Sequence, residues 1–244
     1  MSSRRAPTLT VVVLGVLALM VAQAGADVIY LTTVGSQGSA NGALFHQFDP
    51  EDSTGEGRID PFLQIQGPAS GGEETGYNTT NTLEYDTKDA TWLKVCEPPR
   101  VTVGGVVYCE FLLDVNEAGG DKSLISLDEV RLYVEDTDNL DDSELGTPVY
   151  DLDAGGGNTV ILDASLLGPG SGDGDMLMLV PEEAFGSDGQ AYIYLYCKLG
   201  VTEESESGCE EWAYGTGGEA FTTPEPATLL LLTTGGLLLL RRRR

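Results

Sequence analysis

An acidic stretch in the middle of the chain, DVNEAGGDKSLISLDE at Asp114–Glu129, has residue types and spacing that suit a hard cation. Asp114, Asn116 and Gly119 take the first, third and sixth places of an EF-hand-like count, with oxygen ligands on alternate residues and a glycine at the sharp turn. The stretch predicts a calcium site. The candidate ligands are Asp114, Asn116, Asp121, Asp128 and Glu129.

The same stretch departs from the EF-hand pattern. Ala118 stands at the fifth position and Ile125 at the twelfth, where oxygen ligands are required. The flanking residues are typical of strands rather than helices. The alternative is therefore a plain connection between two strands, with its carboxylates facing water.

The sequence patterns that would indicate catalysis are weaker than the calcium-site pattern. A triad needs a histidine base, and the single histidine, His46, stands in ALFHQFD, which is typical of a strand. Carboxylate pairs for glycoside hydrolysis carry no information among 39 acidic residues, and no glycine-rich phosphate loop followed by lysine occurs. We expect no catalytic role. A secreted hydrolase of matrix polysaccharide is the alternative.

Aromatic side chains suggest a further kind of binding. Exposed aromatic rings on a β-sandwich can stack on sugars, and Trp92, Trp212 and Tyr214 are candidates, so extracellular polysaccharide is a candidate partner. The alternative for Trp212, in CEEWAYG, is a place in the core beside Cys209.

The elements that must position these groups are strands. Runs rich in β-branched and aromatic residues, bounded by Gly, Asp, Asn and Pro, predict strands, and no convincing amphipathic helix occurs. The runs cover residues 27–34, 106–115, 129–136, 158–166 and 190–199. In the last run, alternating tyrosines from Tyr192 to Tyr196 share one face and apolar residues share the other, so one face is expected to be core.

The spacing of these strands predicts the fold class. The 32 glycines cluster mostly between the runs, and neither a repeat nor a long internal linker is visible. Short strands separated by glycine-rich turns favour an all-β fold. We expect a single acidic β-sandwich, jelly-roll-like, over residues 27–220.

The N-terminal segment is typical of a secretory signal peptide. Two arginines precede an apolar run from Val11 to Val21, and small residues follow at Ala24 and Ala26. We expect residues 1–26 to be removed and the rest of the chain to be exported.

The exported part is strongly acidic. Between the arginines at the two ends, the chain carries 7 basic and 39 acidic residues, a net charge of −32. Such a surface repels phosphate backbones, so we expect no nucleic-acid partner. Calcium or a cationic polymer is a better candidate partner for this negative charge. The alternative is that the acidity only keeps an exported protein soluble.

Four cysteines lie in the exported part, where an even number favours two disulfides. Three pairings are possible. We expect Cys96 with Cys109 and Cys197 with Cys209, because each pair is close in sequence with turn-forming residues between. A zinc site is the competing idea, but no close two-residue spacing occurs.

The chain ends in TTPEPATLLLLTTGGLLLLRRRR, from Thr222 to Arg244. The apolar run from Ala227 to Leu240 would be roughly 21 Å long as a helix, which is shorter than the ~30 Å hydrocarbon core of a bilayer. Arginines after the run hold that side in the cytoplasm. We therefore expect a transmembrane helix that is inserted transiently during export, rather than a permanent anchor.

This tail closely resembles the PEP-CTERM sorting signal of exported bacterial proteins. The matching parts are a Pro-Glu-Pro box (Pro224, Glu225 and Pro226), an apolar run and terminal arginines, in that order. In that family a membrane-embedded cysteine protease, exosortase, reads the box and processes the tail. Segments of the body such as EFLLDVNE and EEWAYG also resemble PEP-CTERM proteins of no known activity.

The resemblance implies that residues 221–244 are a sorting signal and that exosortase and the secretion machinery are partners. It also implies delivery to the cell surface or to an extracellular polysaccharide matrix. We therefore expect an exported, non-catalytic surface or matrix protein, with calcium and polysaccharide as the candidate ligands.

Overall fold

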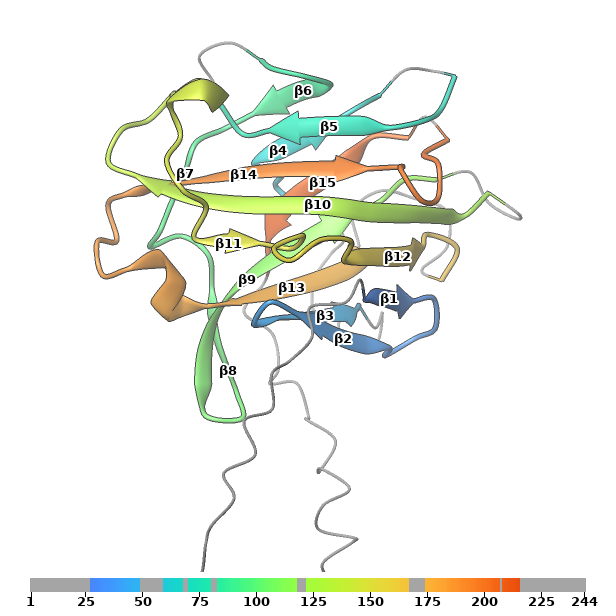
Figure 1. Ribbon diagram of the computed structural model, residues 1–244, viewed down its shortest axis with the longest axis horizontal. Helices are drawn as coiled ribbons and strands as arrows, with labels where there is room; N and C mark the ends of the chain where they lie inside the picture. Colours follow the sequence, from blue (N-terminus) through green and yellow to red (C-terminus); the bar gives the residue numbers. More distant parts are fainter. Residues whose placement is uncertain are drawn as a thin grey trace, which may run out of the picture.

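Two β-sheets packed face to face form the part of the chain that the computed structural model describes (Figure 1). That part comprises residues 27–48, 59–67, 70–79, 83–117, 122–166, 174–206 and 208–215. The expected signal peptide (1–26) and sorting signal (221–244) lie outside the described residues.

The first sheet has seven strands in the described residues. Their order is β1-β12-β10-β14-β5, with β11 paired to β10 and β7 paired to β14. β1 runs parallel to β12, and the other pairs are antiparallel. The strands are β1 (Val28–Leu31), β5 (Glu74–Tyr77), β7 (Leu93–Lys94), β10 (Leu124–Glu135), β11 (Tyr150–Asp151), β12 (Thr159–Asp163) and β14 (Tyr192–Leu199).

The second sheet has eight strands in the same part of the chain, all paired antiparallel. Their order is β2-β3-β13-β9-β15-β4-β6, with β8 paired to β9. The strands are β2 (Gln37–Ala40), β3 (Ala43–Gln47), β4 (Leu63–Ile65), β6 (Thr87–Ala90), β8 (Arg100–Val103), β9 (Val106–Asp114), β13 (Met176–Pro181) and β15 (Glu210–Tyr214). Two short 3₁₀ turns, η2 (Asp142–Glu144) and η3 (Glu182–Phe185), lie in connections.

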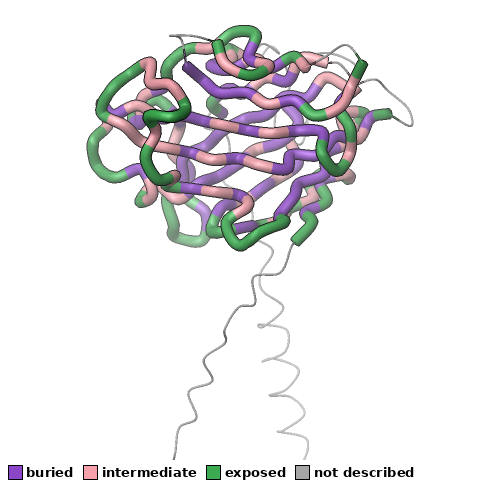
Figure 2. The backbone as a smooth tube through the Cα atoms, turned by 45° about the horizontal axis from the view of Figure 1, so that its top comes forward, coloured by how far each residue is buried: buried purple, intermediate pink, exposed green. Residues whose placement is uncertain are grey.

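The core lies between the two sheets, because successive side chains of a strand point to opposite faces. Figure 2 shows buried positions along the strands and exposed positions in the connections. One apolar cluster contains residues of both sheets, with Phe111 and Trp212 from one and Leu132 and Leu195 from the other. Each large apolar side chain buried in this way stabilises the fold by about 1.5–3 kcal/mol.

Strand β14 shows the predicted alternation. Its apolar side chains are buried in the core, while Tyr192 and Tyr196 are partly exposed on the other face. Tyr194 shares their face but is buried, because its ring stacks on Tyr77 at 5.7 Å and its hydroxyl donates a hydrogen bond to the carbonyl oxygen of Thr137 at 2.5 Å. The loop after β10 therefore covers part of the outer face.

The predicted all-β sandwich is confirmed as two packed sheets. The five predicted strands correspond to β1, β9, β10, β12 and β14. β10 begins at Leu124 rather than at Glu129, so the second half of the predicted calcium stretch is a strand and not a loop. Among the described residues, no helix has the length and apolar character that a bilayer crossing requires.

Candidate functional site

The predicted calcium ligands are divided between the two sheets. Asp114 ends β9, and its carboxylate accepts hydrogen bonds from the Gly174 amide at 3.1 Å and from the Asn116 side chain at 3.3 Å. The Asn116 amide also donates to the carbonyl oxygen of Cys209 at 2.7 Å. Asp121 lies outside the described residues. Asp114 and Asn116 therefore hold neighbouring chain segments together.

Asp128 and Glu129 lie on β10 in the other sheet. Asp128 accepts hydrogen bonds from the Ser126 hydroxyl at 2.6 Å and from the Val201 amide at 2.9 Å. Glu129 forms ion pairs with Arg131 at 2.5 Å and with Lys198 at 3.3 Å. These two carboxylates are engaged by different protein groups, and neither belongs to the set of three described acidic residues whose ligand atoms lie within 4.8 Å of one another. The structure does not bring the four described ligands into a single calcium site.

The two expected disulfides are not present in the structure, where all four cysteines are free thiols. Cys109 lies on β9 with its side chain in the core, whereas Cys96 is exposed. Cys197 lies in the core on β14, whereas Cys209 precedes β15 of the opposite sheet, with its sulfur 3.8 Å from Lys88 Nζ. Closeness in sequence did not predict closeness in space, because each pair joins a buried cysteine to one that is exposed (Cys96) or partly buried (Cys209).

The two tryptophans have opposite environments. Trp212 on β15 has no exposed surface and belongs to the core, so it offers no platform for a sugar. Trp92 is 42% exposed and meets Tyr192 edge to face at 6.0 Å between ring centroids. Lys94 Nζ lies 5.7 Å from the centre of the Trp92 ring and 5.6 Å from that of Tyr192. Of the two tryptophans, Trp92, beside Tyr192, is therefore the exposed one, and Tyr214 is also exposed, at 37%.

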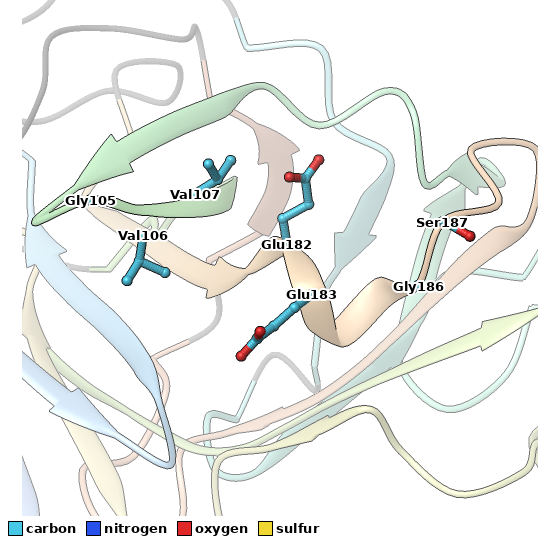
Figure 3. Close-up of a pocket in the computed structure, with 7 residues that line it drawn as sticks. All are labelled: Gly105, Val106, Val107, Glu182, Glu183, Gly186 and Ser187. Atoms are coloured by element: carbon cyan, nitrogen blue, oxygen red, sulfur yellow. The ribbon is translucent and has the colours of Figure 1, made fainter.

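An open depression of about 580 Å³ lies between the β8–β9 hairpin and η3 (Figure 3). Val106 and Val107 line it from the hairpin, and Glu182 and Glu183 come from the 3₁₀ turn, with their side chains pointing in different directions. Glu182 is engaged by Arg100 at 3.0 Å. The depression does not gather the convergent polar groups that a binding site needs.

Three glutamates form the densest group of possible ligands in the described residues. One carboxylate oxygen from each of Glu74, Glu117 and Glu210 lies within 4.8 Å of the others. Glu74 begins β5 in the first sheet, Glu210 begins β15 in the second, and Glu117 follows β9. We name these three residues the carboxylate cluster.

Strand pairing turns two of these glutamates inward. Glu74 pairs with Leu199 and Glu210 pairs with Ile65, and both apolar partners are fully buried in the core. Directly paired residues project to the same face of a sheet, so Glu74 and Glu210 point into the interior from opposite sheets. Glu74 is 1% exposed and Glu210 is 0% exposed, whereas Glu117 is partly buried.

Backbone amides donate a hydrogen bond to one carboxylate oxygen of Glu74 and to one of Glu117. Glu74 Oε2 accepts from the Gly67 amide at 2.7 Å, and Glu117 Oε2 accepts from the Glu206 amide at 2.7 Å. The remaining oxygens are Glu74 Oε1, Glu117 Oε1 and both oxygens of Glu210, and they are buried without a hydrogen-bond donor.

Burial dominates the electrostatics of the cluster. It raises the pKa of the Glu210 carboxyl far above its ordinary value, and the neighbouring carboxylates of Glu74 and Glu117 raise it further. Burial also raises the pKa of Glu117, while hydrogen bonds from the Glu206 amide and the Ser205 hydroxyl act in the opposite direction. Negative charge at this place needs a positive partner, either shared protons or a cation.

Comparisons with protein-family models, with curated proteins and with solved structures found no match.

The sequence contained part of the signal for this cluster. In EEWAYG, Glu210 stands two residues before Trp212, so both share one face of a strand, and burial of the tryptophan implies burial of the glutamate. Glu74 and Glu117 carried no such sign. Their approach depends on pairing between segments far apart in sequence, which one sequence does not specify.

Proposed function

We propose that this chain is an exported, non-catalytic protein of the bacterial cell surface or extracellular matrix, sorted by an exosortase-type protease. The observation that carries the proposal is the order of the C-terminal features: the box at Pro224–Pro226, the short apolar run and the terminal arginines. A segment too short to span a bilayer comfortably suits a temporary membrane stop better than an anchor.

The composition of the chain supports the same role. The residues between the terminal arginines carry a net charge of −32, which favours solubility outside the cell and disfavours anionic partners. The two packed sheets provide a stable body for such a protein. The jelly-roll type of the sandwich stays a prediction.

Mass spectrometry of the protein from its native cells tests this proposal. We expect the mature chain to begin at Asp27, to lack the C-terminal apolar run and to be found outside the cell. A variant with Pro224→Ala and Pro226→Ala should keep its tail and accumulate at the membrane, because the box would no longer be held extended for a protease. Full-length chain in the cytosol of the wild-type host would contradict the proposal.

Polysaccharide binding is a second candidate function, favoured by the exposed ring of Trp92 beside Tyr192 and Lys94. An exposed aromatic with a polar neighbour suits stacking on a sugar ring. Retention on extracted matrix polysaccharide should fall for Trp92→Ala but not for Tyr30→Ala, which removes another exposed aromatic on β1. Equal retention of both variants would exclude this binding surface.

Release of reducing sugar by the purified chain would favour the hydrolase alternative.

A further inference from the structure

We propose that the carboxylate cluster of Glu74, Glu117 and Glu210 binds a divalent cation, with calcium as the ion that fits best. The inference goes beyond the proposed function, because it does not depend on where the protein is delivered. The site also differs from the calcium site predicted at Asp114–Glu129. Glu117 lies within that stretch, but it was not one of the predicted ligands.

The first reason is the state of the oxygens. Glu210 is fully buried, and both of its carboxylate oxygens lack a hydrogen-bond donor. Glu74 Oε1 and Glu117 Oε1 are also buried without a donor. A buried carboxylate oxygen without a partner is costly, and here four of them belong to three residues whose carboxylates converge. An ion among the three carboxylates would supply the missing partner.

The second reason is the sign of the surrounding charge. The charged groups that act on Glu210 and Glu117 are the carboxylates of the cluster itself and of Glu206. The nearby ammonium group of Lys122 is engaged by Glu206, with a contact of 2.5 Å, and lies at the surface. Since no positive group acts on Glu210 or Glu117 among the residues that the structure describes, we infer that the positive partner comes from solvent.

Shared protons are the competing explanation. Glu74 and Glu210 are close enough to share one proton, which would neutralise that pair. The third carboxylate, Glu117, would still face the pair with an oxygen that has no donor. A divalent cation neutralises more of the charge and contacts all three residues.

The chemistry of the ligands selects the kind of ion. Every candidate ligand is an oxygen, which suits calcium, magnesium or manganese rather than zinc. Both oxygens of Glu210 are free, which allows the bidentate contact that calcium accepts, whereas magnesium demands near-ideal octahedral geometry and keeps several waters. The two fully buried carboxylates, Glu74 and Glu210, therefore favour calcium.

Backbone oxygen is also close to the cluster. A Cβ added at Gly208 would lie 1.8 Å from the carbonyl oxygen of Asn116 and 2.8 Å from Glu210 Oε1. Both oxygens thus approach the same glycine, where a side chain has no room. Calcium sites commonly combine carboxylates with backbone carbonyls. The absence of a side chain at Gly208 leaves room for both oxygens.

The position of the cluster gives the ion a structural role. Its ligands come from the start of β5, the segment after β9 and the start of β15, so they belong to both sheets. The loops beside it are also tied together, since Gly72 and Ser205 exchange backbone hydrogen bonds of 2.9 and 3.3 Å. A cation here would join the two sheets at one end of the sandwich.

Two measurements on the full chain, after treatment with chelator, test the proposal: calorimetric titration with calcium, and thermal unfolding with and without calcium. We expect one saturable site per chain and a rise in melting temperature of roughly 5–10 °C at 100-fold excess over Kd. Glu210→Gln and Glu117→Gln should each weaken this binding by roughly tenfold or more, since even changes outside the ligand shell cost that much. Glu183→Gln removes an exposed carboxylate on η3 and should bind as wild type does.

The two cluster variants separate this site from diffuse binding to an acidic surface, because each keeps every other carboxylate. Circular dichroism establishes that each variant is folded, and the partly buried Glu117 provides a second test if Glu210→Gln does not fold. Absence of saturable calcium binding in the wild type would overturn the proposal. Unchanged affinity in both folded cluster variants would also overturn it. Tighter binding of magnesium or manganese than of calcium would keep the site and reject the choice of ion.

Discussion

Glu74 and Glu210 face each other across the interior of the sandwich, one from each sheet. Each is paired in its own sheet with a fully buried apolar residue, Leu199 or Ile65. Two acids thus occupy positions that the alternation of the strands assigns to the core. Stability should be sensitive to charge at this place, and the sensitivity should depend on whether a cation is present.

Glu210→Gln is expected to change stability in opposite directions with and without calcium. In chelator at neutral pH, the variant should be more stable than wild type by about 1–3 kcal/mol. Burial raises the pKa of the Glu210 carboxyl, so the wild type must take up a proton on folding, whereas the amide is neutral and provides a donor for the neighbouring carboxylates. In excess calcium, the wild type should be the more stable protein, because the variant has lost a ligand. Thermal unfolding in both conditions measures this reversal. Wild type more stable by the same amount in both conditions would contradict it.

Gly208→Ala is expected to destabilise the protein and to weaken calcium binding. The added Cβ would meet the Asn116 carbonyl oxygen at 1.8 Å, and backbone must move to relieve that contact. We expect a loss of about 1–3 kcal/mol, typical of overpacking, by urea denaturation. Gly146→Ala is the control, since its Cβ would meet only the flexible end of Glu135 at 3.1 Å. An equal loss of stability in both variants would show that Gly208 does not lie as close to the Asn116 carbonyl oxygen as described.

Trp212→Ala should cost about 3–5 kcal/mol, because the side chain is completely buried between the sheets. Trp92→Ala should cost far less, since Trp92 is an exposed residue. Urea denaturation of the two variants measures both values. Similar losses for both would mean that the assignment of Trp212 to the core is wrong.

Thiol labelling of the native protein should distinguish the four cysteines. Exposed Cys96 should react first, and Cys109 and Cys197 should react only after unfolding. Burial raises the pKa of Cys109 to about 11, so the reactive thiolate is scarce at neutral pH, and burial raises the pKa of Cys197 still further. Mass spectrometry after alkylation identifies the labelled residues. Four unreactive cysteines in denaturant without reductant would instead support the two disulfides.

The sequence was informative about the strands. Regular alternation in β14 identified its core face, because period two follows from the geometry of a strand alone. Tyr194 shows the limit of that reasoning. It lies on the outer face, yet it is buried by contacts with Tyr77 and Thr137 that come from other parts of the chain.

The candidate site was harder to predict for the same reason. Asp114–Glu129 looked like one loop, but β10 begins at Leu124 and places Asp128 and Glu129 in the sheet opposite the one that contains Asp114. The carboxylate cluster instead combines residues that are 43 and 93 positions apart along the chain. Spacing rules apply to local motifs, and they do not extend to contacts made by the packing of two sheets.

The most direct measurement is a crystal structure of the protein grown with calcium, together with anomalous scattering from manganese exchanged into the same crystals. We predict one strong peak between Glu74, Glu117 and Glu210, with calcium–oxygen distances of roughly 2.3–2.6 Å and a bidentate contact to Glu210. An empty cluster, with Glu74 and Glu210 sharing a proton at hydrogen-bond distance in saturating calcium, would contradict the account.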